Sequence, residues 1–435
     1  MNFTKSNIDE LVERTLTIEC FDIRINQNSD TSPFSFRGPG SIALQADGTL
    51  LLNMYDAEKK SDMAGMMRLF FDRQIGIVHE KEYCSLSAID EKGNAWTYPR
   101  LYVKDGLRPG PHGTIINLKV PDLRTSKITT KPFELAQAEI IILGKFTLPF
   151  NKYETNDDYS TLTLLEVFTD EFEFRASQKA KHLKIDVVSR KSIIDRDFIT
   201  KLTEGLGIAI GRDASPAYYS IGSGSNHESF LNGHADIKGL GVMEPLVSVF
   251  YGKTEGFVEF ISSYVNNRTR AHDPLINYWR RLYYVSDIIT DVAALVLTVN
   301  IEGMVKNYFS QRRTPSSEML GYIKLSQNTI RTTKLPSATK IRVQQALGNM
   351  KKLSTTNILK ELVSEGVIDG AQVLSWTALR NSLAHADNGP DDTEGFENFI
   401  DNIYNCLSLF YRLIGLSVGY DFREDSEVKE ELIVE

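Results

Sequence analysis

The chain has 435 residues, of which 42% are hydrophobic, 24% charged and 10% aromatic. This length predicts two or three domains, and the composition excludes a disordered chain, a collagen-like repeat and a disulfide scaffold. The net charge of −8 at pH 7 argues, taken alone, against a nucleic-acid partner.

Two features predict a cytoplasmic protein. The three cysteines, Cys20, Cys84 and Cys406, are scattered and form no CxxC pair, which is typical of reduced thiols. The first residues, MNFTKSNIDELVERTL, have no apolar core, and the richest apolar run is interrupted by Asn300 and Glu302. We therefore expect neither a signal peptide nor a membrane span.

Charge is distributed unevenly along the chain. Residues 268–353 contain 14 Lys or Arg against 5 Asp or Glu, whereas residues 354–435 contain 5 Lys or Arg against 16 Asp or Glu. A basic segment inside an acidic protein indicates a local site for an anionic partner.

Residues 1–190 predict an antiparallel, β-rich, sandwich-like domain. Leu16–Ile25, Ser41–Met54, Thr114–Val120, Ala138–Leu148 and Thr161–Ser189 are rich in β-branched and aromatic residues and are separated by turn residues. The Asp47-Gly48 pair between two apolar runs predicts a hairpin. Strands that do not alternate with helices favour an antiparallel arrangement over a doubly wound sheet.

Residues 191–267 are expected to form a mixed connecting region. Asp195–Ile210 predicts a short helix leading into a strand, Ser220–His234 a polar, glycine-rich loop, and Phe257–Val265 another short helix.

Residues 268–420 predict a helical bundle, and residues 421–435 an acidic tail. Tyr278, Leu282, Val285, Ile289, Val292 and Val296 recur at helical spacing, which fits two helices or one long bent helix. Asn357–Ile368, Gly370–Asp387 and Thr393–Leu416 predict three more helices with short connections. The expected fold class is therefore α+β and multidomain, with a β-rich N-terminal half and an all-α C-terminal bundle.

The histidines of the predicted loop offer a candidate metal site. His227, Glu228 and His234 lie in HESFLNGH, which lacks the HExxH spacing that places two imidazoles on one helix face. No third ligand is apparent nearby, so we expect no metal and no cofactor. A zinc hydrolase built on these histidines is kept as an alternative.

The second candidate site is RNSLAH, within the helix predicted over Gly370–Asp387. On an ideal helix Asn381 and His385 share a face, and the long Arg380 side chain must reach across to meet the imidazole. Such a trio suits RNA cleavage. Histidine can remove the proton of a 2′-hydroxyl near neutral pH, and a guanidinium matches the charge that develops on the phosphate. The competing interpretation is a surface arginine and a histidine near a helix C-terminus.

RNSLAHAD in this setting resembles the signature of HEPN-domain ribonucleases, and VLTVNIEGMVKNYF resembles the first core helix of that family. The β-rich half before a helical domain is similar to ApeA-like proteins of bacterial anti-phage (abortive infection) systems. The resemblance implies a HEPN-type bundle that acts as a metal-independent endoribonuclease and homodimer, with catalytic Arg380 and His385 and an orienting Asn381. It also implies an acidic residue near the pair, for which Glu302 is the candidate.

RNA, with tRNA as one possibility, is thus the expected substrate, and the β half is expected to bind a phage-derived trigger. Eleven cations are expected to line an entry path for phosphates, with Tyr283, Tyr284 and Tyr322 available for base stacking. They are Arg280, Arg281, Arg312, Arg313, Lys324, Arg331, Lys334, Lys340, Arg342, Lys351 and Lys352. Solvated helix faces explain these cations equally well. The alternative function is a non-catalytic protein that dimerises through its helices and whose β half recognises a protein, carbohydrate or nucleic acid.

Overall fold

The computed structural model of the protein describes residues 3–29, 33–57, 78–103, 106–155, 160–191, 193–233, 243–247, 249, 254–286, 290–313, 315–351, 354–384 and 393–422. The chain divides into two compact units. The first comprises Met1–Ile210, Ala214–Gly239 and Val247–Val258, and the second comprises Gly211–Asp213, Leu240–Leu246 and Glu259–Glu435.

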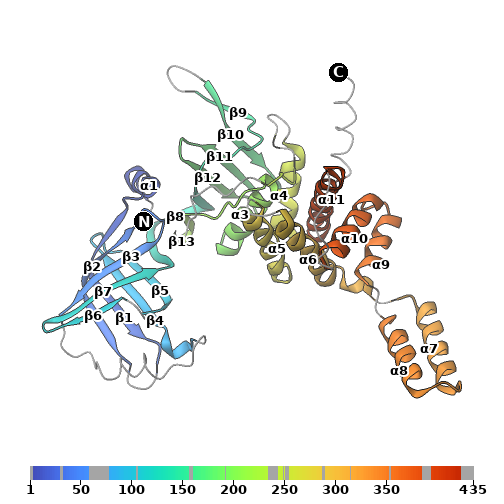
Figure 1. The fold of residues 1–435 in the computed structure, drawn as a ribbon. Helices are drawn as coiled ribbons and strands as arrows, with labels where there is room; N and C mark the ends of the chain where they lie inside the picture. Colours follow the sequence, from blue (N-terminus) through green and yellow to red (C-terminus); the bar gives the residue numbers. More distant parts are fainter. Residues whose placement is uncertain are drawn as a thin grey trace. The chain divides into compact units, whose positions relative to one another are not determined.

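The first unit contains one sheet of 13 strands, in which every described strand pair is antiparallel (Figure 1). The path through it runs β6-β7-β3-β2-β1-β4-β5-β8-β12-β11-β10-β9, and β13 pairs with β8. The antiparallel β-rich half predicted from the sequence is therefore confirmed, although its described strands form one continuous sheet and not the two facing sheets of a sandwich.

The strands have the following bounds: β1 Thr17–Gln27, β2 Ser35–Leu44, β3 Leu50–Asp56, β4 Cys84–Asp90, β5 Ala95–Leu101, β6 Leu107–Gly110, β7 Gly113–Val120, β8 Asp122–Leu143, β9 Lys152–Thr155, β10 Ser160–Phe168, β11 Phe172–Gln178, β12 His182–Ser189 and β13 Tyr218–Asn232.

The predicted hairpin at Asp47-Gly48 joins β2 and β3. Gly48 has a φ of 87°, a backbone conformation that favours glycine, and Asp47 Oδ1 accepts a hydrogen bond of 3.0 Å from the Thr49 amide. The turn residues thus determine the register in which Leu44 pairs with Leu50.

The 22-residue strand β8 links the two parts of the sheet. Along one edge it pairs first with β5, at Arg124 and Thr125, and later with β12, from Gln137 to Leu143. Along its other edge it pairs with β13. A single long strand can therefore belong to both parts because each neighbour occupies a different stretch of it.

The loop predicted over Ser220–His234 is wrong, because most of it forms β13. From Asn226 onward its side chains alternate as in a half-buried strand, with His227 and Ser229 buried and Glu228 exposed. The glycines that suggested a loop lie where the register with β8 shifts, and Gly224 adopts a φ of 53°. The β unit thus includes part of the region expected to connect two domains.

A hydrophobic core lies inside the first part of the sheet, whose strands curl around it (Figure 1). Ile23, Ile42, Leu52 and Trp96, from four different strands, are fully buried. Helix α1 (Lys5–Val12) contributes the buried Leu11. Alternation along each strand directs one set of side chains inward and the other toward solvent.

The second unit is helical, as predicted. The helices of the described residues are α3 Arg196–Ile210 in the first unit, α4 Glu255–Asn267 across the boundary, and α5 Asp273–Val285, α6 Thr290–Tyr308, α7 Ser317–Thr332, α8 Ser337–Asn349, α9 Thr355–Ser364, α10 Gly370–Ala384 and α11 Thr393–Ser417. The short 3₁₀ helices are η1 Glu80–Glu82, η2 Arg270–His272 and η3 Ser310–Arg313. None of the described helices is long and apolar enough to cross a membrane.

The long apolar pattern after Pro274 forms two helices, α5 and α6, and its phase changes between them. The buried face of α6 contains Ala294, Leu297, Ile301 and Met304, whereas Val292 of the predicted stripe is 40% exposed. One continuous helical repeat cannot describe both helices, because α5 ends at Val285 and α6 begins at Thr290.

Helices α7 and α8 were not predicted from the sequence. These two helices pack against each other, and Ile323 is the single buried side chain described in them. With so few buried positions, the apolar periodicity that signals a helix is weak in this segment.

The β4–β5 turn provides a test of this fold. Asp90 is 3% exposed and accepts hydrogen bonds from Trp96 Nε1 at 3.0 Å and from the Lys92 and Asn94 amides. Asp90→Ala leaves a fully buried indole N–H unpaired, so we expect it to reduce the free energy of unfolding by about 3 kcal/mol. Urea unfolding measures this, with the exposed Glu91→Ala as control (about 0.5 kcal/mol or less). Equal effects would contradict the assigned hydrogen bonds.

Candidate functional site

Helix α10 carries the RNSLAH motif and begins at a reciprocal cap. The Asp369 carboxylate accepts a hydrogen bond of 2.9 Å from the Ala371 amide, and the Gln372 side chain accepts one of 3.1 Å from the Asp369 amide. These contacts satisfy amides that a helix N-terminus leaves unpaired, and they define where the helix starts.

Three polar contacts hold α10 in register on its neighbours. The buried Trp376 donates from Nε1 to the Thr298 carbonyl of α6 at 3.2 Å. Toward α11, Gln372 Nε2 donates to Ser408 Oγ at 2.8 Å, and Asn405 Nδ2 donates to Ser375 Oγ at 3.2 Å. A buried donor can be satisfied only at the correct register. The Trp376 bond therefore determines which α6 residue faces each α10 residue, and the other two bonds align α10 with α11.

One turn beyond Trp376, the structure brings Arg380 and Glu302 together. Arg380 Nε donates to Glu302 Oε1 at 2.9 Å, and the guanidinium carbon lies 5.8 Å from the centre of the Trp376 ring. The side chains remain 49% and 40% exposed. The pair therefore holds the arginine in place while leaving it open to a ligand from solvent.

Of the other two predicted catalytic residues, Asn381 lies among the described residues and His385 does not. Asn381 is exposed and follows Arg380 on α10. His385 lies outside the described residues, which end on this helix at Ala384. Its proximity to Arg380 therefore stays a prediction from the helical spacing of the motif.

Three leucines of α10 differ in their burial. Leu379 is 2% exposed and Leu383 is half-buried, but Leu374 is 73% exposed. At 100° per residue, Leu374 lies about 160° round the helix from Trp376, which faces the core. Leu374 thus lies on the same exposed side of α10 as Asn381.

An exposed apolar stripe on α6 was not predicted. Val292, Leu295 and Val299 are 40%, 47% and 53% exposed, at the i, i+3 and i+7 spacing of one helix face. Glu302 continues this face by one further step. Apolar side chains grouped on one exposed face are typical of a protein contact surface.

The alternative zinc site, built on His227 and His234, lies only partly within the described residues. His227 is 3% exposed on β13, where its ring lies 6.0 Å from that of Phe133. Glu228 points to the opposite face, and His234 lies outside the described residues. No group of three or more potential metal ligands occurs among the residues that the structure describes.

Two of the eleven predicted cations are ion-paired. Arg280 pairs with Asp213 at 3.9 Å, and Arg312 pairs with Glu365. Tyr283 is buried against Trp279, with ring centres 5.1 Å apart, so its predicted role in base stacking is wrong. Tyr284 and Tyr322 are 43% and 58% exposed. Lys352 and the Arg313 side chain lie outside the described residues.

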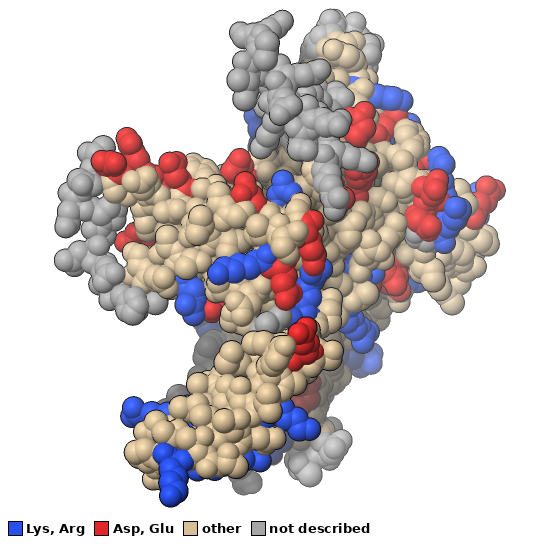
Figure 2. All heavy atoms as spheres, turned by 90° about the vertical axis from the view of Figure 1, so that its right-hand side faces the viewer, with Lys and Arg blue, Asp and Glu red and all other residues tan. Residues whose placement is uncertain are grey.

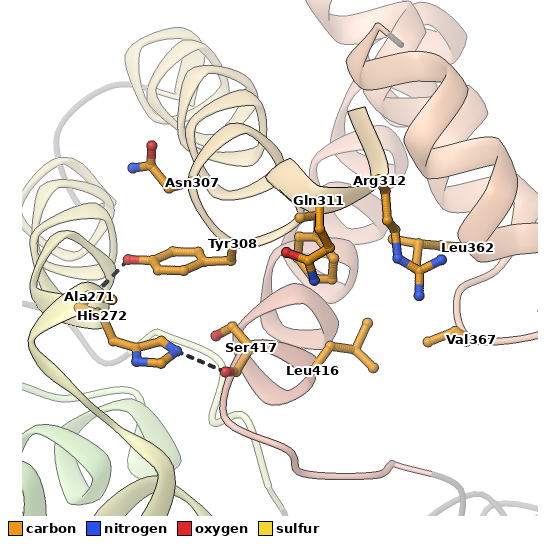
Figure 3. Close-up of a pocket in the computed structure, with 11 residues that line it drawn as sticks. Ala271, His272, Asn307, Tyr308, Gln311, Arg312, Leu362, Val367, Leu416 and Ser417 are labelled. Carbon is orange, nitrogen blue, oxygen red and sulfur yellow. Dashed lines mark hydrogen bonds between the residues drawn. The ribbon is translucent and has the colours of Figure 1, made fainter. Parts of the chain in front are cut away.

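A cavity of about 440 Å³ lies at the ends of α6 and α11 (Figure 3). Its wall includes His272, Tyr308, Arg312 and Ser417. His272 Nδ1 accepts from the Thr269 amide at 3.0 Å, so Nε2 carries the proton and donates to the Ser417 carbonyl. Both nitrogens of the imidazole are engaged and Arg312 is ion-paired, so these groups stabilise the wall of the cavity. Arg380 and Glu302 do not line this cavity.

The exposure of the Arg380–Glu302 pair predicts a small contribution to stability. Exposed ion pairs contribute about 1 kcal/mol or less, so we expect Arg380→Ala and Glu302→Ala each to lower the free energy of unfolding by no more than that. Trp376→Ala should cost about 3–5 kcal/mol, because it removes a buried indole. Denaturant unfolding compares the three. Equal losses for Arg380→Ala and Trp376→Ala would show that the arginine is a structural residue.

The buried His227 predicts a dependence of stability on pH. Burial lowers the pKa of its imidazole to about 4, whereas unfolding returns it to about 6.5. Its stabilising contribution is therefore complete above pH 6.5 and is lost as the pH falls toward 4. We expect the wild type to lose about 2 kcal/mol more than His227→Phe between pH 8 and pH 5 in urea unfolding. His79→Gln, an exposed control, should behave as the wild type, and parallel curves for His227→Phe would contradict the buried neutral imidazole.

No protein-family model, curated protein or solved structure matches the chain. Function must therefore be inferred from the geometry of the described residues and from the motif on α10.

Proposed function

We propose that this protein is a metal-independent, HEPN-type endoribonuclease that acts as a cytoplasmic homodimer in bacterial anti-phage defence of the ApeA-like, abortive-infection kind. The observation that carries the proposal is the exposed ion pair between Arg380 of the RNSLAH motif and Glu302 of α6. Glu302 belongs to the helix whose sequence resembles the first core helix of the family, in which an acidic residue near the motif is expected.

The proposed chemistry assigns each side chain one task. Glu302 holds Arg380 through Nε, so the Nη groups are directed to a phosphate, and a guanidinium can donate to two phosphate oxygens at once. His385 takes the proton of the ribose 2′-hydroxyl as the 2′ oxygen attacks the adjacent phosphorus. The bond from phosphorus to the 5′ oxygen then breaks, which leaves a 2′,3′-cyclic phosphate and, after protonation, a 5′-hydroxyl.

The leaving 5′ oxygen needs a proton from an acid, and a second copy of the chain supplies this acid. The exposed apolar face of α6, formed by Val292, Leu295 and Val299, supports a contact between copies beside Glu302. In such a dimer two copies of His385 act on one linkage, one as base and the other as acid. Asn381, which is exposed and follows Arg380 on α10, orients the Arg380 and His385 side chains.

The β unit is proposed to recognise the trigger, a phage-derived component. Its support is architectural, since it forms a compact unit separate from the bundle that carries the motif. RNA, including tRNA, is the proposed substrate, because the attacking 2′-hydroxyl is absent from DNA.

Cleavage of a structured RNA such as tRNA in EDTA tests this function. We expect the wild type to cleave, and Arg380→Ala and His385→Ala to lower the rate by about 10²–10⁴, since one removes charge stabilisation and the other the base. Glu302→Gln should have a smaller effect, because the arginine remains but is held less firmly. Arg270→Ala, an exposed arginine of η2 that belongs to neither the motif nor the eleven predicted cations, is the matched control.

Three outcomes would contradict the proposal. Loss of wild-type cleavage in EDTA indicates a metal enzyme, and stoichiometric zinc in elemental analysis would support the alternative built on His227 and His234. If His385→Ala retains every activity, including growth arrest on overexpression, the protein is a non-catalytic binding and dimerisation protein. Equal loss with Arg270→Ala shows that general charge, and not the motif, is responsible.

A further inference from the structure

The hairpin of α7 and α8 is the most positively charged part of the described chain. Residues 315–351 contain six Lys or Arg and one acidic residue, Glu318. Glu318 accepts a hydrogen bond of 3.2 Å from the Tyr322 hydroxyl. Figure 2 shows blue side chains over this hairpin, in the lower foreground, on a chain that is acidic as a whole.

These cations have no carboxylate partner in the part of the chain that the structure describes. Lys324, Arg331, Lys334, Arg342 and Lys351 are exposed. Lys340 donates to the Arg331 carbonyl at 2.8 Å, a contact that leaves its charge unneutralised. In the β unit, by contrast, Lys152, Lys179 and Lys184 each pair with a glutamate. Six unneutralised charges repel one another, and binding a polyanion relieves this repulsion.

The cations extend along the whole hairpin. Lys324 and Arg331 lie seven residues apart on one face of α7, with Asn328 between them, Lys334 lies in the connecting turn, and Arg342 lies on α8. Tyr322 is 58% exposed but lies about 160° round α7 from Lys324, so it is not part of this basic face. Basic and amide side chains bind a phosphate backbone.

The apolar side chains of the hairpin argue against a membrane surface as its partner. Residues 315–351 contain no Trp or Phe, the residues that usually anchor an interfacial helix together with leucine. The exposed apolar residues include Met319, Tyr322 and Leu325 on α7, Ile341 on α8 and Met350 directly after α8. They do not form the broad apolar face that such a helix buries in lipid.

We propose that the α7–α8 hairpin is an RNA-holding arm, which binds the phosphate backbone of a single strand through these cations. The identity of the polyanion as RNA rests on the proposed function, whereas the charge of the arm does not. The arm contains none of the residues assigned to cleavage, so it raises affinity for the substrate without taking part in the chemistry.

Fluorescence anisotropy of a fluorescein-labelled, mixed-sequence single-stranded RNA tests the arm on the full chain. The Arg380→Ala background and EDTA keep the RNA intact, so binding can be read whether or not the wild type cleaves. Lys324→Gln, Arg331→Gln and Arg342→Gln are combined in one variant. Three lost phosphate contacts predict a weaker affinity by up to about 50-fold near 0.15 M salt, and a slope of log K against log salt that is less steep by about 2.

Two further variants separate local charge from other effects. Lys92→Gln, Lys127→Gln and Lys131→Gln remove the same charge from exposed sites in the β unit, and should change the affinity less than twofold. Lys324→Arg, Arg331→Lys and Arg342→Lys keep the charge of the arm and should bind as the parent does. Circular dichroism checks that each variant is folded.

Each remaining outcome overturns the proposal. Equal loss in the arm and β-unit variants shows that only net charge matters. No loss in the arm variant shows that the arm does not hold RNA. If the arm variant loses binding to phosphatidylserine vesicles in co-sedimentation but keeps its affinity for RNA, the arm is a membrane contact. Failure of the proposed nuclease is distinct from all of these, because it appears as absent cleavage by the wild type with RNA binding intact.

Discussion

The candidate site depends on one buried hydrogen bond, from Trp376 of α10 to the Thr298 carbonyl of α6. The indole is 1% exposed, so its N–H must find an acceptor inside the protein. At this register Arg380, one turn further along α10, meets Glu302, one turn further along α6. A site at the surface is thus positioned by a contact in the core, which solvent does not weaken.

This division of tasks suits a binding site. An exposed ion pair contributes little to stability, because water and salt screen it. Its geometric effect is larger, since Glu302 restricts the orientation of a long side chain that would otherwise sample many rotamers. The guanidinium is therefore oriented before a phosphate arrives, which lowers the entropy cost of binding one.

The charges of the chain follow a similar division. In the β unit the buried Glu166 pairs with Lys152 and Arg175, so that opposite charges neutralise each other within the fold. On α7 and α8 the cations are left without such partners among the described residues, in a hairpin with one described buried side chain. A net charge of −8 therefore conceals a surface on which an anion can bind.

Local patterns predicted the features that depend on neighbouring residues. Runs of β-branched and aromatic residues between turn residues predicted the strands, Asp47-Gly48 the β2–β3 hairpin, and helical periodicity α9, α10 and α11, because strand, turn and helix propensities are local properties. Long-range contacts were visible only in the folded protein. Its structure showed that Ser220 to Asn232 continue the sheet along β8 and that Tyr283 is buried against Trp279. The family resemblance named Glu302 as the acidic candidate, and the fold brings it to Arg380 across 78 positions of sequence. Burial and pairing at such separations depend on which elements pack together, and no local pattern in the chain encodes that choice.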